Sequence, residues 1–76
     1  MTLKRLRLEL GWTQARMAQS LGVGQTTVSD WETEGMPRQK AVAVAKWTEK
    51  VARRRKRPEL ACHRDALMFP NEKEAA

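Results

Sequence analysis

Cysteine, histidine and serine side chains are the first candidates for chemistry in this sequence. Cys62 and His63 are the single cysteine and the single histidine of the 76 residues. One thiolate and one imidazole do not complete a tetrahedral metal site. Ser20 and Ser29 lie far from His63 in sequence, so an activated serine nucleophile is not indicated either. We therefore expect no enzymatic activity, no metal and no cofactor.

Hydrogen-bonding side chains gather instead on one predicted helix that begins at Gln25. Val28 and Trp31, three residues apart, are expected to face the core of the protein. The helical repeat then turns a set of polar side chains to the opposite face. They are Thr26, Ser29, Asp30 and Thr33, with Gln25 at the leading end. Such a face binds a polar surface or is simply solvated.

A run of five basic residues, Arg53 to Arg57, is the second charged feature of the sequence. Three interpretations of this run are open. It is the solvated end of a helix, favoured there by the helix dipole; an arm that contacts phosphates; or an arginine-rich segment that binds RNA or a membrane surface.

The charge of the whole chain also favours a polyanionic partner. Lys and Arg number 15 against 9 acidic residues, which gives a net charge of +6, and such a surface attracts nucleic acid. Residues 1–52 carry 8 basic and 5 acidic groups, residues 53–57 carry 5 basic groups, and residues 58–76 carry 2 basic and 4 acidic groups. The basic excess is therefore greatest between two segments, and we expect a domain over residues 1–57 and a C-terminal helix and tail over residues 58–76.

Apolar spacing and turn residues predict an all-α fold, a compact bundle of four to five short helices. A leucine stripe predicts a helix over residues 2–10. Thr13 is a good N-cap for a helix over residues 14–21. Gly22 ends that helix, and a short turn leads to the helix that begins at Gln25, which makes a helix-turn-helix.

Two further helices are predicted beyond this pair. Pro37 suits the first turn of a fourth helix, whose apolar pattern continues into the basic run. Pro58 separates the fourth helix from a further segment, and the apolar residues of that segment predict a short fifth helix. They are Leu60, Ala61, Leu67 and Met68.

Residues 3–37, LKRLRLELGWTQARMAQSLGVGQTTVSDWETEGMP, resemble the phage repressor and Cro type of helix-turn-helix domain. Ala18 must be small because the next helix crosses there, and Gly22 supplies the turn. The resemblance rests on the pattern of Gln14, Ala18, Gly22, Val23, Val28 and Trp31.

The resemblance implies a role for each polar residue of the helix pair. In that family the second helix enters the major groove of double-stranded DNA, and dimers read two half-sites. Base readout then falls to Gln25, Thr26 and Ser29, whose side chains suit base edges. Phosphate contact and positioning are assigned to Gln14, Arg16, Thr27, Thr33 and Arg38. The resemblance also implies that Gln14 braces Gln25 and that Arg7 pairs with Glu32.

Asp30 departs from what a DNA-facing position prefers. Phosphates repel a carboxylate there unless it accepts a hydrogen bond from the cytosine N4 amine. We therefore leave Asp30 out of the predicted base readers.

The C-terminal segment caps its own domain or contacts a partner. We favour the partner, because a chain this small has few apolar residues to spare for a second cluster. Leu60, Leu67 and Phe69 are the predicted homodimer contacts, since homodimers are the commonest assemblies.

Together these features predict a DNA-binding transcriptional regulator, a repressor that binds a pseudo-palindromic operator as a homodimer. The alternative is an antitoxin-type protein whose main partner is a toxin, and a third class is an arginine-rich RNA-binding protein. No apolar run is long enough for a signal peptide or a membrane span, so we expect a cytoplasmic protein.

Overall fold

The computed structural model describes residues 1–70 and places five α-helices and one 3₁₀ turn in them. In chain order they are α1 (Leu3–Leu10), α2 (Gln14–Leu21), α3 (Gln25–Glu34), α4 (Arg38–Arg54), η1 (Pro58–Leu60) and α5 (Arg64–Met68). Residues 1–70 contain no strand, so the predicted all-α fold is confirmed. Among these residues no helix is both long and apolar enough to cross a membrane.

The first three helices begin and end where the sequence predicts, within one residue. The Thr2 and Thr13 hydroxyls accept hydrogen bonds from the Arg5 and Arg16 backbone N–H groups, both at 3.1 Å, and so cap α1 and α2. Both helices end at a glycine in the left-handed conformation, Gly11 and Gly22, each with φ 71°. Thr2 itself is the cap and lies outside α1, which starts at Leu3.

The core is formed by one cluster of apolar side chains from every helix. Leu6, Met17 and Val28 have no exposed surface, and Trp31 is also buried. From the C-terminal part, Leu60, Cys62 and Leu67 belong to the same cluster. The expected boundary between residues 57 and 58 therefore does not divide the core, because the C-terminal segment fills part of it.

The fifth helix is shorter than the sequence predicts. Leu60 ends the 3₁₀ turn, and Ala61 is extended, with φ −66° and ψ 133°. His63 then caps α5, because its Nδ1 accepts a hydrogen bond from the Asp65 N–H at 3.1 Å. This single histidine thus has a structural role at the start of α5.

Two backbone contacts fix α5 against the end of α3. The Met36 N–H donates to the Leu67 carbonyl at 2.9 Å. Gly35, with φ 100°, lies so close to the Met68 carbonyl that a Cβ there would overlap it. Only glycine combines this φ with this close approach.

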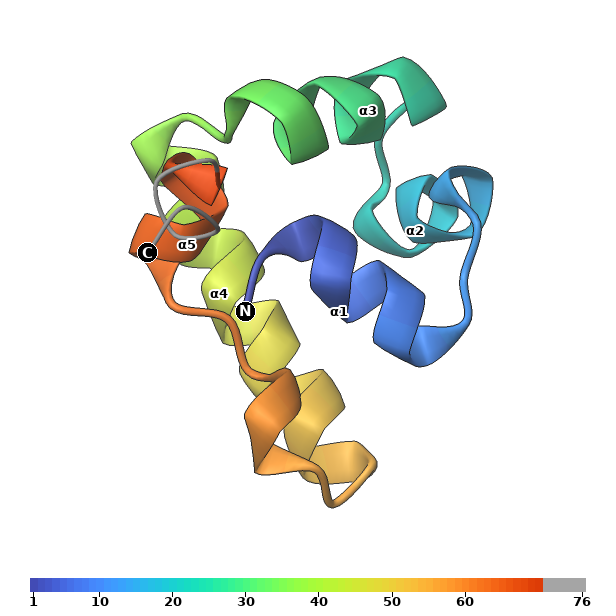
Figure 1. Ribbon diagram of the computed structural model, residues 1–76, viewed down its shortest axis with the longest axis vertical. Coiled ribbons are helices and arrows are strands. Elements are labelled where there is room, and N and C mark those ends of the chain that lie inside the picture. Colours follow the sequence, from blue (N-terminus) through green and yellow to red (C-terminus); the bar gives the residue numbers. More distant parts are fainter. Residues whose placement is uncertain (71–76) are drawn as a thin grey trace.

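The long axis of the molecule separates α3 from the C-terminal end of α4. The molecule measures 29 × 27 × 22 Å. Viewed with the long axis vertical, α3 lies across the top, and α4 descends from beside it to the turn around residue 56 at the bottom (Figure 1).

Candidate nucleic-acid interface

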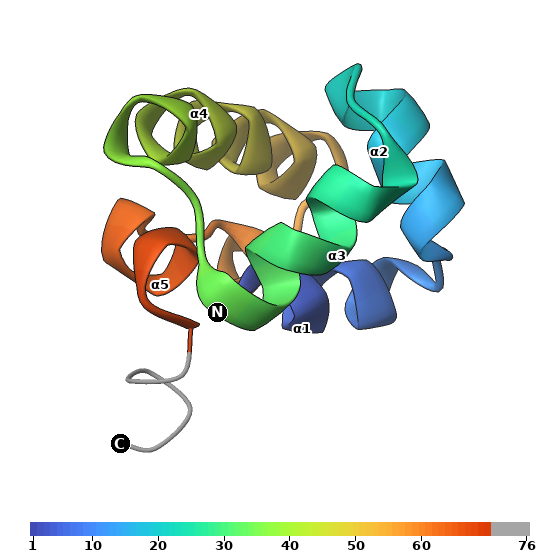
Figure 2. The same cartoon turned by 90° about the horizontal axis from the view of Figure 1, so that it is seen from above.

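The turn between α2 and α3 is fixed by backbone hydrogen bonds. Gly22 and Val23 donate to the carbonyls of Gln19 and Ala18 at 3.3 and 3.0 Å. Gly24 is the N-cap of α3. Because it has no side chain, α3 begins without a side-chain cap. The two helices meet at this turn, and α3 crosses the molecule when it is seen from above (Figure 2).

The outer face of α3 is polar, as the sequence predicts. Val28 and Trp31 are buried beneath it. Gln25 and Thr26, the first two residues of α3, are exposed, whereas Ser29 is half-buried. The Gln25 side chain makes no hydrogen bond to any residue in 1–70, so its amide is available to a ligand.

The other predicted positioning residues of α3 differ in their exposure to solvent. Thr27 is half-buried and Thr33 is exposed. The Thr33 hydroxyl donates to the Ser29 carbonyl at 3.0 Å, one turn back along the helix. Its hydroxyl is therefore engaged with its own helix.

A largely buried polar network holds α3 against α1 and α2. The Arg7 guanidinium donates to both Glu32 carboxylate oxygens, from Nε at 2.7 Å and from Nη2 at 3.3 Å. The Arg7 and Glu32 side chains are 13% and 5% exposed. Arg7 also donates to the Trp12 carbonyl at 3.0 Å. The predicted Arg7–Glu32 pair is confirmed, and it joins α3 to α1.

Gln14 joins this network and does not brace Gln25. Its Nε2 donates to Glu32 Oε1 at 3.2 Å. The expected Gln14–Gln25 contact is therefore wrong, because the Glu32 carboxylate is the better acceptor. Gln14 is half-buried, and it positions α3 through Glu32.

The basic groups lie beside α3 and not on it. The acidic residues of α3 are Asp30, Glu32 and Glu34, and the helix has no Lys or Arg. Arg38 and Lys40, in the first turn of α4, are exposed close to the end of α3 in the chain. Lys40 is a candidate phosphate contact that the sequence analysis missed, although its place next to Arg38 could have indicated it.

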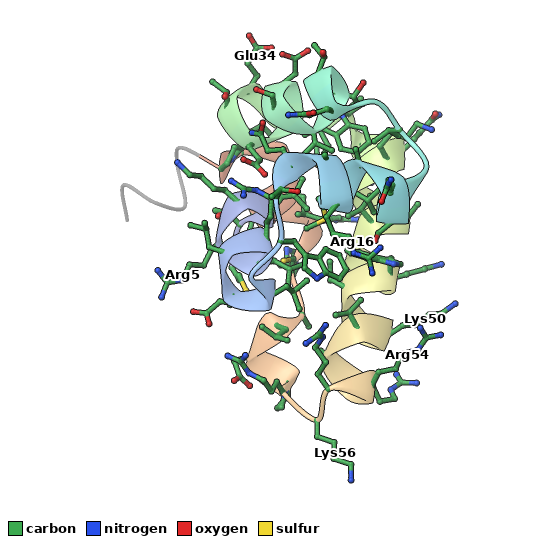
Figure 3. All side chains as sticks on the ribbon, turned by 90° about the vertical axis from the view of Figure 1, so that its right-hand side faces the viewer. Arg5, Arg16, Glu34, Lys50, Arg54 and Lys56 are labelled. Carbon is green, nitrogen blue, oxygen red and sulfur yellow. The ribbon has the colours of Figure 1, made fainter. Side chains whose placement is uncertain are left out.

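Arg16 lies on the side of the molecule. Its guanidinium carbon is 4.9 Å from the centre of the Trp12 ring, a cation–π contact. Figure 3 shows it well below Glu34, which marks the α3 end. Arg16 is exposed in the first turn of α2, and its contact with phosphates stays a prediction.

The basic run lies at the opposite end of the long axis from α3. Figure 3 labels Glu34 at one end and Lys56 at the other. Arg53 and Arg54 form the last turn of α4, and Arg55 follows them. The run therefore lies away from α3, and its contact with phosphates stays a prediction.

Arg57 differs from the rest of the run because it is paired. Its guanidinium lies 3.0 Å from Glu59 and 3.2 Å from Glu9. These hydrogen bonds, that to Glu59 first, raise the pKa of Arg57. Arg57 therefore ties the end of the run to α1.

Two of the three predicted dimer residues are not on the surface. Leu60 is 0% and Leu67 is 1% exposed, because both pack in the core of their own chain. The prediction that they contact a partner is wrong for this fold. Phe69 is 48% exposed and remains accessible.

The cysteine is buried away from solvent. Its neighbours are polar: the Cys62 N–H donates to the Thr48 hydroxyl at 2.9 Å, and Thr48 in turn donates to the Ala45 carbonyl at 2.7 Å. Burial raises the pKa of the Cys62 thiol to about 11. Within residues 1–70 no three His, Cys, Asp or Glu side chains lie together as a metal site would require.

A helical domain whose helix pair exposes the polar N-terminal half of its second helix has the architecture of a helix-turn-helix DNA-binding protein. A helix-turn-helix family model matches residues 3–43, and the chain belongs to this family, which includes the phage repressor and Cro-type proteins. The family is one of DNA-binding regulators. No curated protein and no solved structure shows significant similarity to the chain.

Proposed function

We propose that this protein is a transcriptional repressor that binds a pseudo-palindromic operator as a homodimer, with the N-terminal half of α3 in the major groove. The observation that carries the proposal is the exposed Gln25 amide at the leading end of a helix that the buried Arg7–Glu32 pair holds in place. A preorganised helix loses little conformational freedom when it binds.

The chemistry of the α3 face supports readout of base edges. Gln25 offers one donor and one acceptor, which match the N6 and N7 edge of adenine. The Thr26 hydroxyl and methyl group suit several bases, including the thymine methyl group. Ser29 lies one turn further along α3 and is half-buried. Its hydroxyl therefore contributes to base readout only where the DNA approaches α3 closely.

Phosphate contact is assigned to residues that flank α3. Arg38 and Lys40 are exposed cations at the start of α4. Such contacts fix the register of the protein on the duplex and carry no sequence information themselves. Because α3 carries no cation, these flanking groups are expected to offset the repulsion between Asp30 and the phosphates.

The homodimer is supported by the two-fold operators of the family and by one exposed aromatic residue. Phe69 is an exposed apolar side chain at the end of α5. We expect Phe69→Glu to weaken self-association without unfolding the chain. Sedimentation of this variant and the parent on DNA would measure the effect, and a parent that binds as a monomer would contradict the dimer.

Selection of bound sequences from random duplex DNA tests the proposed function most broadly. We expect enrichment of one site with two inverted half-sites. An asymmetric enriched site would contradict the homodimer, and a pool that shows no enrichment would contradict sequence-specific binding. Placing the enriched site over a promoter, with expression of the protein varied, then tests repression.

A further inference from the structure

We propose that the end of α4 opposite α3 binds a second segment of duplex DNA, so that one chain bridges two duplexes. We define this surface, the basic end, as Lys50, Arg53, Arg54, Arg55 and Lys56. The inference rests on the proposed function, because it assumes that the α3 end holds the first duplex.

The cations of the basic end are exposed and unpaired. All five side chains are exposed, and none forms an ion pair with another residue of 1–70. Lys50, Arg53 and Arg54 line one shallow surface depression together. Glu49 is the acidic neighbour, beside Arg53 and Lys56. Five positive charges against one negative charge leave a strong net attraction for phosphates.

The basic end lies away from α3: Figure 3 shows Lys56 at the end of the molecule opposite Glu34, and Lys50 and Arg54 on the side of α4, below Arg16. The long axis measures 29 Å, with α3 at one end and Lys56 at the other (Figure 3). A straight duplex seated on α3 therefore lies at the far end of the protein from Lys56. The unpaired cations are therefore available to a second polyanion.

The backbone conformation at Lys56 supports a role for its side chain in binding. Lys56 has φ 55° and is the one non-glycine residue of 1–70 with positive φ. At the ends of α1 and α2 the corresponding left-handed residues are Gly11 and Gly22. A left-handed conformation is unfavourable for lysine and free for glycine. The chain thus keeps a charged side chain at the tip of the basic end despite this strain.

The surroundings of the basic end favour a duplex over single-stranded nucleic acid. Single strands are bound by aromatic rings on which bases stack. Trp12 and Trp47 line a depression together with Arg54 and Arg55. Both rings are half-buried, their centres are 6.4 Å apart, and Arg16 already covers Trp12, so neither presents an open face for stacking. A duplex requires no such platform, because a regular array of phosphates binds to exposed cations alone. Once α3 is bound, neighbouring DNA is also present at a high local concentration.

The experiment is capture of a second duplex by protein bound to a first. Beads carry a duplex with the site selected from random DNA, and a fluorescent duplex of unrelated sequence is added after the protein. The test variant is Arg53→Ser/Arg54→Ser/Arg55→Ser, and the matched control is Arg53→Lys/Arg54→Lys/Arg55→Lys, which keeps the charge. Circular dichroism confirms that each variant is folded.

We expect the parent and the lysine variant to capture the fluorescent duplex, and the serine variant to capture about tenfold less or lower still. Binding to the bead duplex should be the same for all three proteins. Equal capture by the serine variant would overturn the inference, as would a parallel loss of binding to the bead duplex, which would place the basic end on the first duplex.

Two further outcomes separate this inference from the function on which it rests. A parent that binds the bead duplex but captures nothing overturns the inference alone, whereas a parent that does not bind the bead duplex overturns the proposed function. Tighter capture of a fluorescent RNA hairpin than of duplex DNA would overturn the choice of duplex.

Discussion

The α3 end and the basic end of this protein have opposite compositions. The α3 end exposes uncharged hydrogen-bonding groups together with the acidic side chains of Asp30 and Glu34, and α3 has no basic residue. The basic end exposes five cations, with Glu49 as their acidic neighbour. A net charge of +6 therefore indicates a polyanionic partner without locating its site. Hydrogen-bonding groups can discriminate between bases, and cations alone attract any duplex.

The two ends also differ in what holds them. The α3 end depends on a buried ion pair and on close backbone packing against α5. The basic end is a solvated helix terminus, joined to α1 through the ion pair of Arg57 with Glu9. Substitutions should therefore change stability at the α3 end far more than at the basic end.

The largest expected effect comes from breaking the buried pair. Arg7→Met leaves the Glu32 carboxylate buried with the Gln14 amide as its remaining side-chain donor. An uncompensated buried charge costs about 3 to 5 kcal/mol, whereas replacing both partners by apolar residues is often nearly neutral. Urea unfolding should thus show a large loss for Arg7→Met and recovery of most of it for Arg7→Met/Glu32→Leu.

Substitutions in the basic end should change the free energy of unfolding far less than Arg7→Met does. Arg53→Ser/Arg54→Ser/Arg55→Ser changes exposed side chains, each of which should alter the free energy of unfolding by no more than about 0.5 kcal/mol. A loss as large as that of Arg7→Met would contradict the distinction between the two ends.

Gly35→Ala should have the next largest effect. The new Cβ would overlap the Met68 carbonyl, and alanine would also be held at φ 100°. Overpacking costs about 1 to 3 kcal/mol, and a left-handed conformation costs about 1 to 2 kcal/mol. Thermal unfolding measures the sum. Gly11→Ala is the matched control, because its φ is 71° and no atom lies within 4 Å of its Cβ position, so a loss of equal size there would exclude the close contact as the cause.

A pH effect is expected from the core that lies between the two ends. Burial raises the pKa of Cys62 from its ordinary 9.0 to about 11. Between these values the unfolded chain has lost a proton that the folded chain keeps. This contribution to stability is therefore complete below pH 9 and falls by about 1.4 kcal/mol per pH unit as the pH rises towards 11. Cys62→Ala should remove this part of the slope, and an identical pH dependence in parent and variant would show that the thiol does not cause it.

A small gain in stability is expected at the tip of the basic end. Lys56→Gly relieves a left-handed lysine and should raise the free energy of unfolding by about 1 kcal/mol. The gain would be measured by urea unfolding, with Lys50→Gly, inside α4, as the control that should lose stability. A loss of stability at Lys56 would show that its side chain contributes to the fold.

The helix-turn-helix could be predicted from the sequence because its signals are local. The capping threonines, the glycines that end α1 and α2, and the spacing of Val28 and Trp31 each lie within one or two helical turns. The Arg7–Glu32 pair spans 25 residues, and it was predicted only through the resemblance to a family.

The C-terminal half could not be predicted in the same way. Whether Leu60 and Leu67 form core or surface depends on how η1 and α5 fold back on α4, and apolar spacing is the same for both outcomes. The contacts that decide it, from Met36 to Leu67 and from Cys62 to Thr48, join residues far apart in the chain. The position of the basic run relative to α3 likewise depends on the length and direction of α4.

The central claim is that Gln25 is the main base reader, and competition binding tests it most directly. Parent and Gln25→Ala proteins are compared on the selected duplex and on duplexes altered at one base pair at a time. We expect Gln25→Ala to bind the selected site about 1 to 3 kcal/mol more weakly and to lose preference at one base pair in each half-site, with helix content unchanged. A Gln25→Ala protein that keeps the parent's affinity and its full preference at every base pair would contradict the account.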